Sequence, residues 1–324
     1  MAAKSETQNS ARYIGIRHRV KTTKKGESRP TQVAIIAGDE TTKIDLATEM
    51  DELDFVHGRF PSAYRAAEPE EDLAVFLPRH LKTRRLKKGE DVSAIPPKLL
   101  VTVDREERVV TKVPASYAGL AAGDTVSFPL GGSGDNLAIA VSKKALAIGA
   151  TVSRIPSFVL TANRPKDKED DAENLALLAR DRPELFYRIR PRDIDFIVLR
   201  VCQRALTDTM KDRIATEQRL LKRVEGMIFR DSPDGLVPEG TIEDAFLAAK
   251  ATDRILAGQV ADEKAREKEL VAALNALDIY RELFQPIEGV GPRIAARIIA
   301  GIGDIRRYGS KPKFRAACGA HVMR

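Results

Sequence analysis

The chain is poor in the residues from which metal and redox sites are built. Only two cysteines occur in 324 residues, Cys202 and Cys318, and they form no CxxC pair. Four histidines are scattered along the chain without the spacing of metal ligands. Disulfide frameworks and zinc sites need several such residues at short spacing, so the sequence predicts neither and favours a reducing compartment.

Aromatic residues and long apolar runs are also scarce. Tryptophan is absent and aromatic residues make up 5% of the chain, which argues against a single-strand binder built on stacked rings. The sequence shows neither the apolar stretch of a signal peptide nor a run of about 18 apolar residues, so export is not expected and no membrane partner is expected. A cytoplasmic, nucleoid-associated protein is the corresponding expectation.

Positive charge is abundant and unevenly distributed. Lys and Arg number 54 against 47 Asp and Glu, giving a net charge of +7, which suits a polyanionic partner or simply a basic soluble protein. Residues 79–88 contain no acid, and from Pro286 onward the only acids are Glu288 and Asp304. The bases of that second stretch are Arg293, Arg297, Arg306, Arg307, Lys311, Lys313, Arg315 and Arg324.

A glycine turn near the end of the chain is the most informative motif. Gly289 and Gly291 are separated by one apolar residue and followed by Pro292, which can begin a helix. Free N–H groups and the dipole of that helix favour a phosphate there, and Arg293 and Arg297 would flank the same phosphates. The motif therefore predicts a helix-hairpin-helix that holds a nucleic-acid backbone without reading sequence. An ordinary helical corner with a solvated basic face is the alternative.

The first half of the chain predicts a mixed sheet. Strands are expected at 13–16 and 31–36 as an antiparallel pair, with a short-helix insertion at about 40–98 and a hairpin at 99–113. A strand at 125–128, a helix at 136–148 and a strand at 151–155 form a βαβ unit. The glycine turn at 131–134 lacks the full nucleotide-binding spacing, so a plain strand-to-helix turn is preferred there. An antiparallel pair followed by a βαβ unit is the build of an α/β, RNase H-like (RuvC-like) fold.

A helix with an acidic start follows, over residues 166–179. Asp167, Asp170 and Asp171 lie in or near its first turn, where the helix dipole stabilises negative charge. Clustered carboxylates of this kind can bind Mg²⁺ for phosphoryl transfer, provided that neighbouring strands supply further carboxylates. By itself the pattern is a helix start with favourable electrostatics.

Two long amphipathic helices are predicted after residue 191. Apolar residues recur at three- and four-residue spacing from Phe196 to Val224 and again from Ile242 to Phe284, with Pro and Gly between. This pattern predicts an antiparallel helical hairpin, or a coiled coil with a second subunit. Gly258 leaves room for a kink or break in the second helix. A homo-oligomer is the preferred expectation.

The order of these elements resembles the DEDD transposases of the IS-one-ten insertion-sequence family. The segment KDKEDDAENLALLA is similar to the acidic helix of that family, and PIEGVGPRIAARIIAGIGDIRRYGSKPKFRAACG to its C-terminal transposase segment. The resemblance implies a RuvC-like domain at 1–190, a coiled hairpin at 191–285 and a helix-hairpin-helix at 286–324. It also implies double-stranded DNA as partner and Mg²⁺ as cofactor if the chain is catalytic. Because some members are guided by RNA, it leaves open a structured guide RNA.

The residues implied for catalysis depart from the family pattern. Asp171 matches the last helix Asp and would be a catalytic and magnesium-binding residue, with Asp167 and Asp170 beside it. The other acidic positions of the family fall on Arg17, on Pro129 or Leu130, and on Lys168. An arginine places positive charge where a cation should bind. Metal-dependent cleavage by this chain is therefore expected to be absent or very weak.

Three hypotheses follow from the sequence. The chain is a DNA recombinase in which displaced acids such as Asp39, Glu40 or Asp135 complete a site with Asp171. Alternatively, it is a non-catalytic nucleic-acid-binding or architectural protein derived from such an enzyme. The third alternative is an unrelated assembly protein with a helical hairpin. The number of carboxylates on the central strands distinguishes the first two and favours the second for activity.

Overall fold

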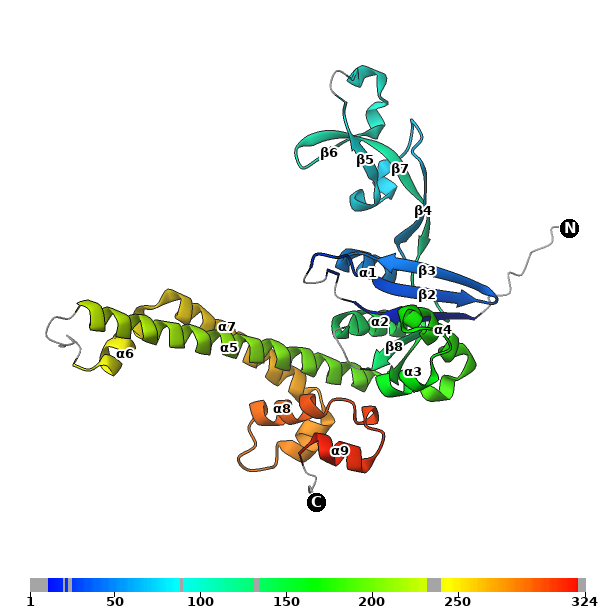
Figure 1. Ribbon diagram of the computed structural model, residues 1–324. Coiled ribbons are helices and arrows are strands. Elements are labelled where there is room, and N and C mark those ends of the chain that lie inside the picture. Colours follow the sequence, from blue (N-terminus) through cyan, green and yellow to red (C-terminus); the bar gives the residue numbers. More distant parts are fainter. Residues whose placement is uncertain are drawn as a thin grey trace. The chain divides into compact units, whose positions relative to one another are not determined.

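The chain divides into two compact units, Met1–Arg188 and Ile189–Arg324. The computed structural model describes residues 11–19, 21–22, 25–87, 90–130, 134–231 and 240–319 (Figure 1). The predicted boundary at residue 190 lies close to this division. The predicted helical hairpin and the predicted C-terminal segment belong to the same unit.

The first unit contains a six-stranded mixed sheet. Its strands are β1 (Arg12–Arg17), β2 (Thr31–Ala37), β3 (Glu40–Leu46), β8 (Thr125–Leu130), β9 (Thr151–Pro156) and β10 (Tyr187–Arg188), in the order β10-β9-β8-β1-β2-β3. The first three strands are antiparallel, β8 is parallel to β1, and β9 is parallel to β8. The predicted strand pair and βαβ unit are both present. The third strand was not predicted because most of its side chains are exposed and it lacks apolar alternation.

Helix α4 (Asp171–Asp181) packs tightly against β1. Its apolar side chains Ala172, Leu175, Ala176 and Ala179 are all buried, as their spacing predicts. At Gly15 of β1, an added Cβ would lie 1.9 Å from the carbonyl oxygen of Ala172. Only glycine permits this approach, so the start of α4 is fixed against the centre of the sheet. The other helices of this unit are α1 (Glu49–Val56), α2 (Asp135–Ile148) and α3 (Ser157–Asn163).

A second, smaller sheet occupies much of the predicted insertion. Its strands are β4 (Phe60–Ala66), β5 (Lys82–Arg85), β6 (Leu100–Val103) and β7 (Glu106–Ala118). The order is β4-β7-β5, and β6 also pairs with β7. The short helices predicted at 40–98 are present, as α1 and as single 3₁₀ turns at 73–75, 78–80, 92–94 and 97–99, but the strands of this segment were not predicted. The predicted hairpin at 99–113 is present, but it belongs to this second sheet.

Asp54 of α1 is an ion-pair centre within this unit. Its carboxylate, 2% exposed, accepts hydrogen bonds from Arg59 at 2.8 Å and from Arg79 Nε at 2.9 Å, and lies 2.7 Å from His80 Nε2. Burial alone would raise the pKa of Asp54, but the hydrogen bonds from Arg79, His80 and Arg59 together hold it well below its usual range. Two bases of the predicted basic stretch at 79–88 thus have an internal partner.

The second unit begins with an antiparallel helical hairpin. Helix α5 (Pro191–Asp231) runs beside α6 (Ile242–Thr252) and α7 (Arg254–Asn275), as Figure 1 shows. The second predicted helix is broken, but at Asp253 and not at Gly258: the Asp253 side chain accepts a hydrogen bond from the Leu256 amide and caps α7. Gly258 lies inside α7.

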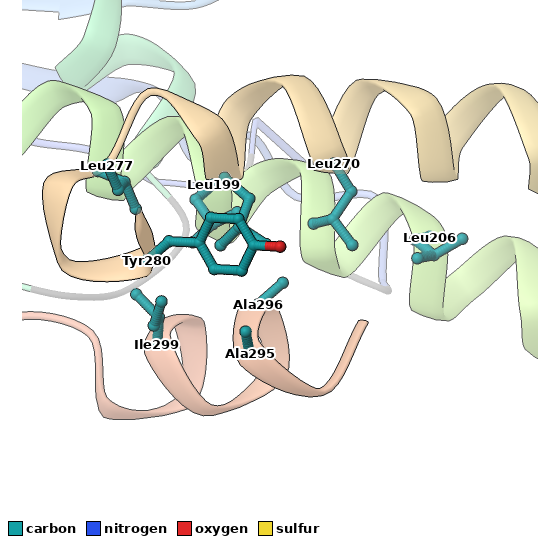
Figure 2. Packing of buried hydrophobic residues seen from close by; sticks show 9 residues of the cluster. Leu199, Leu206, Leu270, Leu277, Tyr280, Ala295, Ala296 and Ile299 are labelled. Carbon is teal, nitrogen blue, oxygen red and sulfur yellow. The ribbon is translucent and has the colours of Figure 1, made fainter. Parts of the chain in front are cut away.

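The seam of the hairpin is closed within one chain. Leu199, Leu206, Leu270, Leu274 and Leu277 are at most 3% exposed and form one cluster, against which Met210 packs. Figure 2 shows that the side chains from α5 and α7 meet there. The structure therefore resolves the two alternatives for these helices in favour of a hairpin. A homo-oligomer would need a surface other than these leucines.

The chain ends in short helical segments that pack on the hairpin. A π-helical turn at Tyr280–Phe284 precedes α8 (Pro292–Ile302), a 3₁₀ turn at Ile305–Arg307 and α9 (Lys311–Ala317). Tyr280, Ala295, Ala296 and Ile299 join the leucine cluster (Figure 2). The small alanines let the backbone of α8 approach the hairpin closely. Within the parts of the chain described above, no helix combines the length and the apolar character that crossing a bilayer requires.

Candidate nucleic-acid interface

The glycine turn leads into an uncapped helix. Gly289 has a φ of +82°, a left-handed conformation that favours glycine, and Gly291 is the N-cap of α8. No side chain caps α8, whereas side chains of Thr241, Asp253 and Ser310 cap α6, α7 and α9. An added Cβ would meet nothing within 4 Å at either glycine, so the approach to the helix start is open. The turn thus has the backbone features of an anion site.

The two arginines of α8 have different surroundings. The Arg293 guanidinium donates to both carboxylate oxygens of Glu267, at 2.6 and 2.7 Å, and lies 3.1 Å from Glu263. These contacts hold the pKa of Glu267 below its ordinary value. Arg297 is exposed and forms no ion pair with any described residue. Of the two, Arg297 is the one whose charge no described acid of this unit compensates.

Other bases of the C-terminal stretch also differ in whether they have an acidic partner. Arg306 pairs with Asp304 at 2.7 Å and with Asp193 at 3.4 Å. Lys311 and Arg315 of α9 are exposed and have no ion pair among the described residues. The side chain of Arg307 and all of Arg324 lie outside the described part. Among the described residues of this region, bases without an acidic partner therefore lie on α8 and α9.

Asp171 lies among arginines. It is the first residue of α4, is 6% exposed, and accepts a hydrogen bond from Arg164 Nε at 2.6 Å. Arg17 Nε, at the end of β1, lies 3.8 Å from its other oxygen. The position follows from the close packing of α4 on β1 at Gly15. The sequence identified Arg17 but not Arg164.

The neighbouring acids are likewise bound by cations. Glu169 accepts a hydrogen bond from Arg19 at 2.7 Å, which lowers the pKa of Glu169. Lys43 of β3 lies 3.0 Å from Asp170 and 2.9 Å from Glu173. Asp167 has an exposed side chain, and its backbone carbonyl accepts from Asn174 at 2.9 Å. Lys168 is also exposed.

The displaced acids lie at both ends of the sheet. Asp39 and Glu40 flank the turn between β2 and β3, where Ala37 pairs with Arg12 at the start of β1, so they are remote from Arg17 and Asp171. The hypothesis that Asp39 or Glu40 completes a site with Asp171 is therefore wrong. Asp135 begins α2, is 2% exposed, and lies 3.5 Å from the guanidinium of Arg154.

Arg154 is another charged residue that was not predicted from the sequence, as are Arg164, Arg19 and Lys43. It lies on β9, is 5% exposed, and donates to the backbone carbonyl of Pro129 at 3.3 Å. A single arginine inside an otherwise buried strand, Thr151-Val152-Ser153-Arg154-Ile155, was the available signal. Among the residues described, no group of three or more Asp, Glu, His or Cys side chains is arranged to hold a metal.

Comparison of the chain with protein-family models and with curated proteins found no match. Function is therefore inferred from the geometry of these residues.

Proposed function

We propose that this protein binds the phosphate backbone of nucleic acid, with double-stranded DNA as its main partner. The observation that carries the proposal is the turn at 289–291, which leads into the uncapped start of α8, the helix that also carries Arg297, a base without an acidic partner among the described residues. Free amide groups at a helix start favour an anion, and an arginine one turn further on adds a charge-assisted contact. Neither feature reads base edges, so binding is independent of sequence at this site.

The architecture supports a relation to RNase H-like proteins. Three antiparallel strands followed by two parallel ones, in the order β9-β8-β1-β2-β3, is the strand arrangement expected of that fold. The helical turn at 280–284, the glycine turn and α8 have the sequence of parts of a helix-hairpin-helix. Both likenesses favour descent from a DEDD transposase. A guide RNA would contact the same backbone-binding surfaces.

The residues around Asp171 do not fit a magnesium ion. A divalent cation needs several oxygen ligands that converge without competing positive charge. Here Arg164 donates to both carboxylate oxygens of Asp171, and Arg17 lies 3.8 Å from one of them. Lys43 contacts Asp170, and Arg154 lies 3.5 Å from Asp135. We therefore propose binding without metal-dependent strand cleavage, and no catalytic step is assigned to these acids.

Salt-dependent binding tests the proposal. The full chain is titrated against a fluorescently labelled duplex of mixed sequence at several salt concentrations. Because bound cationic side chains release counterions, affinity should fall steeply as salt rises, and Arg297→Gln should reduce the slope by roughly 0.9. Arg223→Gln is a matched control, since Arg223 of α5 is also exposed and without an ion pair among the described residues.

Two outcomes would overturn the proposal. One is a flat response of affinity between low and physiological salt. The other is an Arg297→Gln slope equal to that of the unaltered chain, with the Arg223→Gln variant also unchanged. An equal loss in both variants would mean that net charge alone, and no particular surface, attracts the duplex.

A further inference from the structure

Most cationic side chains of the small sheet have an acidic partner. The ion pairs are Arg59 and Arg79 with Asp54, Arg65 with Glu71, Arg84 with Glu90, Arg85 and Arg108 with Glu106, and Lys98 with Glu70. These contacts include the three arginines of the basic stretch at 79–88, Arg79, Arg84 and Arg85. Lys82 has no acidic partner among the described residues, and its register partner in the sheet is a second base of this kind.

That second base is Lys112, which lies directly opposite Lys82. The two residues are register partners in the antiparallel pair of β5 and β7, and both are exposed. Like charges at opposed positions destabilise a sheet. No carboxylate of a described residue lies within ion-pair distance of either ammonium group. The arrangement therefore has an electrostatic cost that an anion would remove.

Tyr64 of β4, on the other side of β7 from Lys82, contacts one of these charges. The ammonium of Lys82 lies 4.9 Å from the centroid of the Tyr64 ring, a cation–π contact that restricts the side chain. Lys112 also pairs with Ala66 of β4, two residues beyond Tyr64, so all three side chains share one face of the sheet. The next residue of β7, Val113, is fully buried in the core on the opposite face.

We infer that Lys82 and Lys112, with Tyr64 as a positioning residue, form a second contact for the backbone phosphates of duplex DNA. The inference rests on the proposed function and adds a second surface to it. Ammonium groups act as point charges on phosphate and select no base, so this contact is also independent of sequence. Lys82 and Lys112 thus present positive charge that does not stabilise the folded sheet but can bind phosphate.

The test uses the full chain and the duplex titration described above. In the variant Lys82→Gln/Lys112→Gln, two phosphate contacts are lost, and the slope of log affinity against log salt should fall by about 1.8. The matched control is Lys143→Gln/Lys144→Gln, which removes the same charge from α2, where no described acid pairs with either lysine. It should leave the slope unchanged. Tyr64→Leu keeps both charges and should weaken binding about two- to five-fold.

A loss of duplex binding in Lys82→Gln/Lys112→Gln would not be explained by misfolding of that variant. Removing opposed like charges relieves repulsion, so the double variant should be at least as stable as the unaltered chain. On the unaltered chain, bound duplex should also slow chemical acetylation of Lys82 and Lys112 several-fold, without protecting Lys143.

The outcomes separate the two proposals. Binding that weakens in Arg297→Gln but is unchanged in Lys82→Gln/Lys112→Gln, without protection of either lysine, would overturn this inference alone. Absence of duplex binding by the unaltered chain would overturn both.

Discussion

Asp171 is neutralised from two directions. Arg164 and Arg17 lie 2.6 and 3.8 Å from its oxygens, and the carboxylate is nearly buried. Acids that gather to bind a cation repel one another, so removing one of them often relieves strain. An acid held by arginines behaves in the opposite way, because its loss leaves guanidinium groups without a partner.

Asp171→Ala should therefore destabilise the protein, by about 1–3 kcal/mol. Urea unfolding followed by circular dichroism measures the change. The control is Asp167→Ala, which removes an exposed carboxylate of the same segment and should change stability by no more than about 0.5 kcal/mol. A gain in stability for Asp171→Ala would show that repulsion between acids dominates this site.

The Asp54 carboxylate should make stability depend on acid pH. Its pKa is lowered in the folded state, so its contribution is present above the unfolded value of about 3.9 and is lost as pH falls toward the folded pKa. Asp54→Asn should cost about 2 kcal/mol at pH 7 and less at pH 3. Urea unfolding of both proteins at the two pH values tests this. An equal cost at pH 7 and pH 3 would contradict it.

At the scale of single residues, the sequence identifies charged residues but not the residues with which they form ion pairs. The acids at the start of α4 and Arg17 are visible in the chain as clusters and as departures from a family pattern. Arg293 was expected to contact phosphate, yet Glu267, 26 residues earlier, binds it because α7 and α8 pack together. Pairings of this kind depend on packing that no local pattern specifies.

At the scale of helices, leucine side chains fill the interface between α5 and α7, and alanines allow α8 to pack closely against them. Leu270 and Leu274 of α7 face Leu199 and Leu206 of α5, while Ala295 of α8 lets its backbone approach. The periodicity predicts which residues are buried. It does not determine whether the helix that packs against them belongs to the same chain or to another chain. In this structure α5 packs against α7 of the same chain.

Leu274→Ala should lower the free energy of unfolding by about 3 kcal/mol without changing molecular mass in solution. Leu274 is fully buried, whereas Leu247 of α6 is 53% exposed, so Leu247→Ala should have little effect. Urea unfolding and light scattering measure the two quantities. A fall in molecular mass with unchanged stability would instead indicate a seam between subunits.

The glycines of the turn should respond differently to alanine. Gly289→Ala places a side chain at a φ of +82° and should cost about 1 kcal/mol. Gly291 has a φ of −69° and open space around it, so Gly291→Ala should leave stability unchanged while its methyl group hinders a phosphate and weakens duplex binding several-fold. Thermal unfolding measures the stability of both variants, and fluorescence anisotropy measures their affinity for the duplex. Unaltered binding by Gly291→Ala would place the phosphate elsewhere.

Elements with strong periodicity were predicted well, and weakly patterned ones were not. The long helices and the βαβ unit have apolar residues at regular spacing. The small sheet has short strands whose charged residues alternate irregularly, with register shifts between β4 and β7. Asp253 was overlooked as a helix break because a capping aspartate is a subtler signal than glycine.

For the molecule as a whole, magnesium-dependent cleavage of DNA should be absent or very weak. The purified chain is incubated with Mg²⁺ or Mn²⁺ and supercoiled DNA carrying its own genomic flanks, beside Asp171→Ala. No nicking or joining above background is expected in either, because arginines occupy the carboxylate that would bind metal. Nicking that disappears in Asp171→Ala would restore the enzyme hypothesis.

The central sheet of the first unit has a consequence for synthesis of the chain. Strand β1 pairs with β2 early, but its other edge pairs with β8, and Ser127 donates to the Ile14 carbonyl across 113 residues. At about 5–20 residues per second, a ribosome needs on the order of ten seconds to deliver that partner. Until then the nascent three-stranded sheet has a free edge at β1, and this interval is when a chaperone would be most needed.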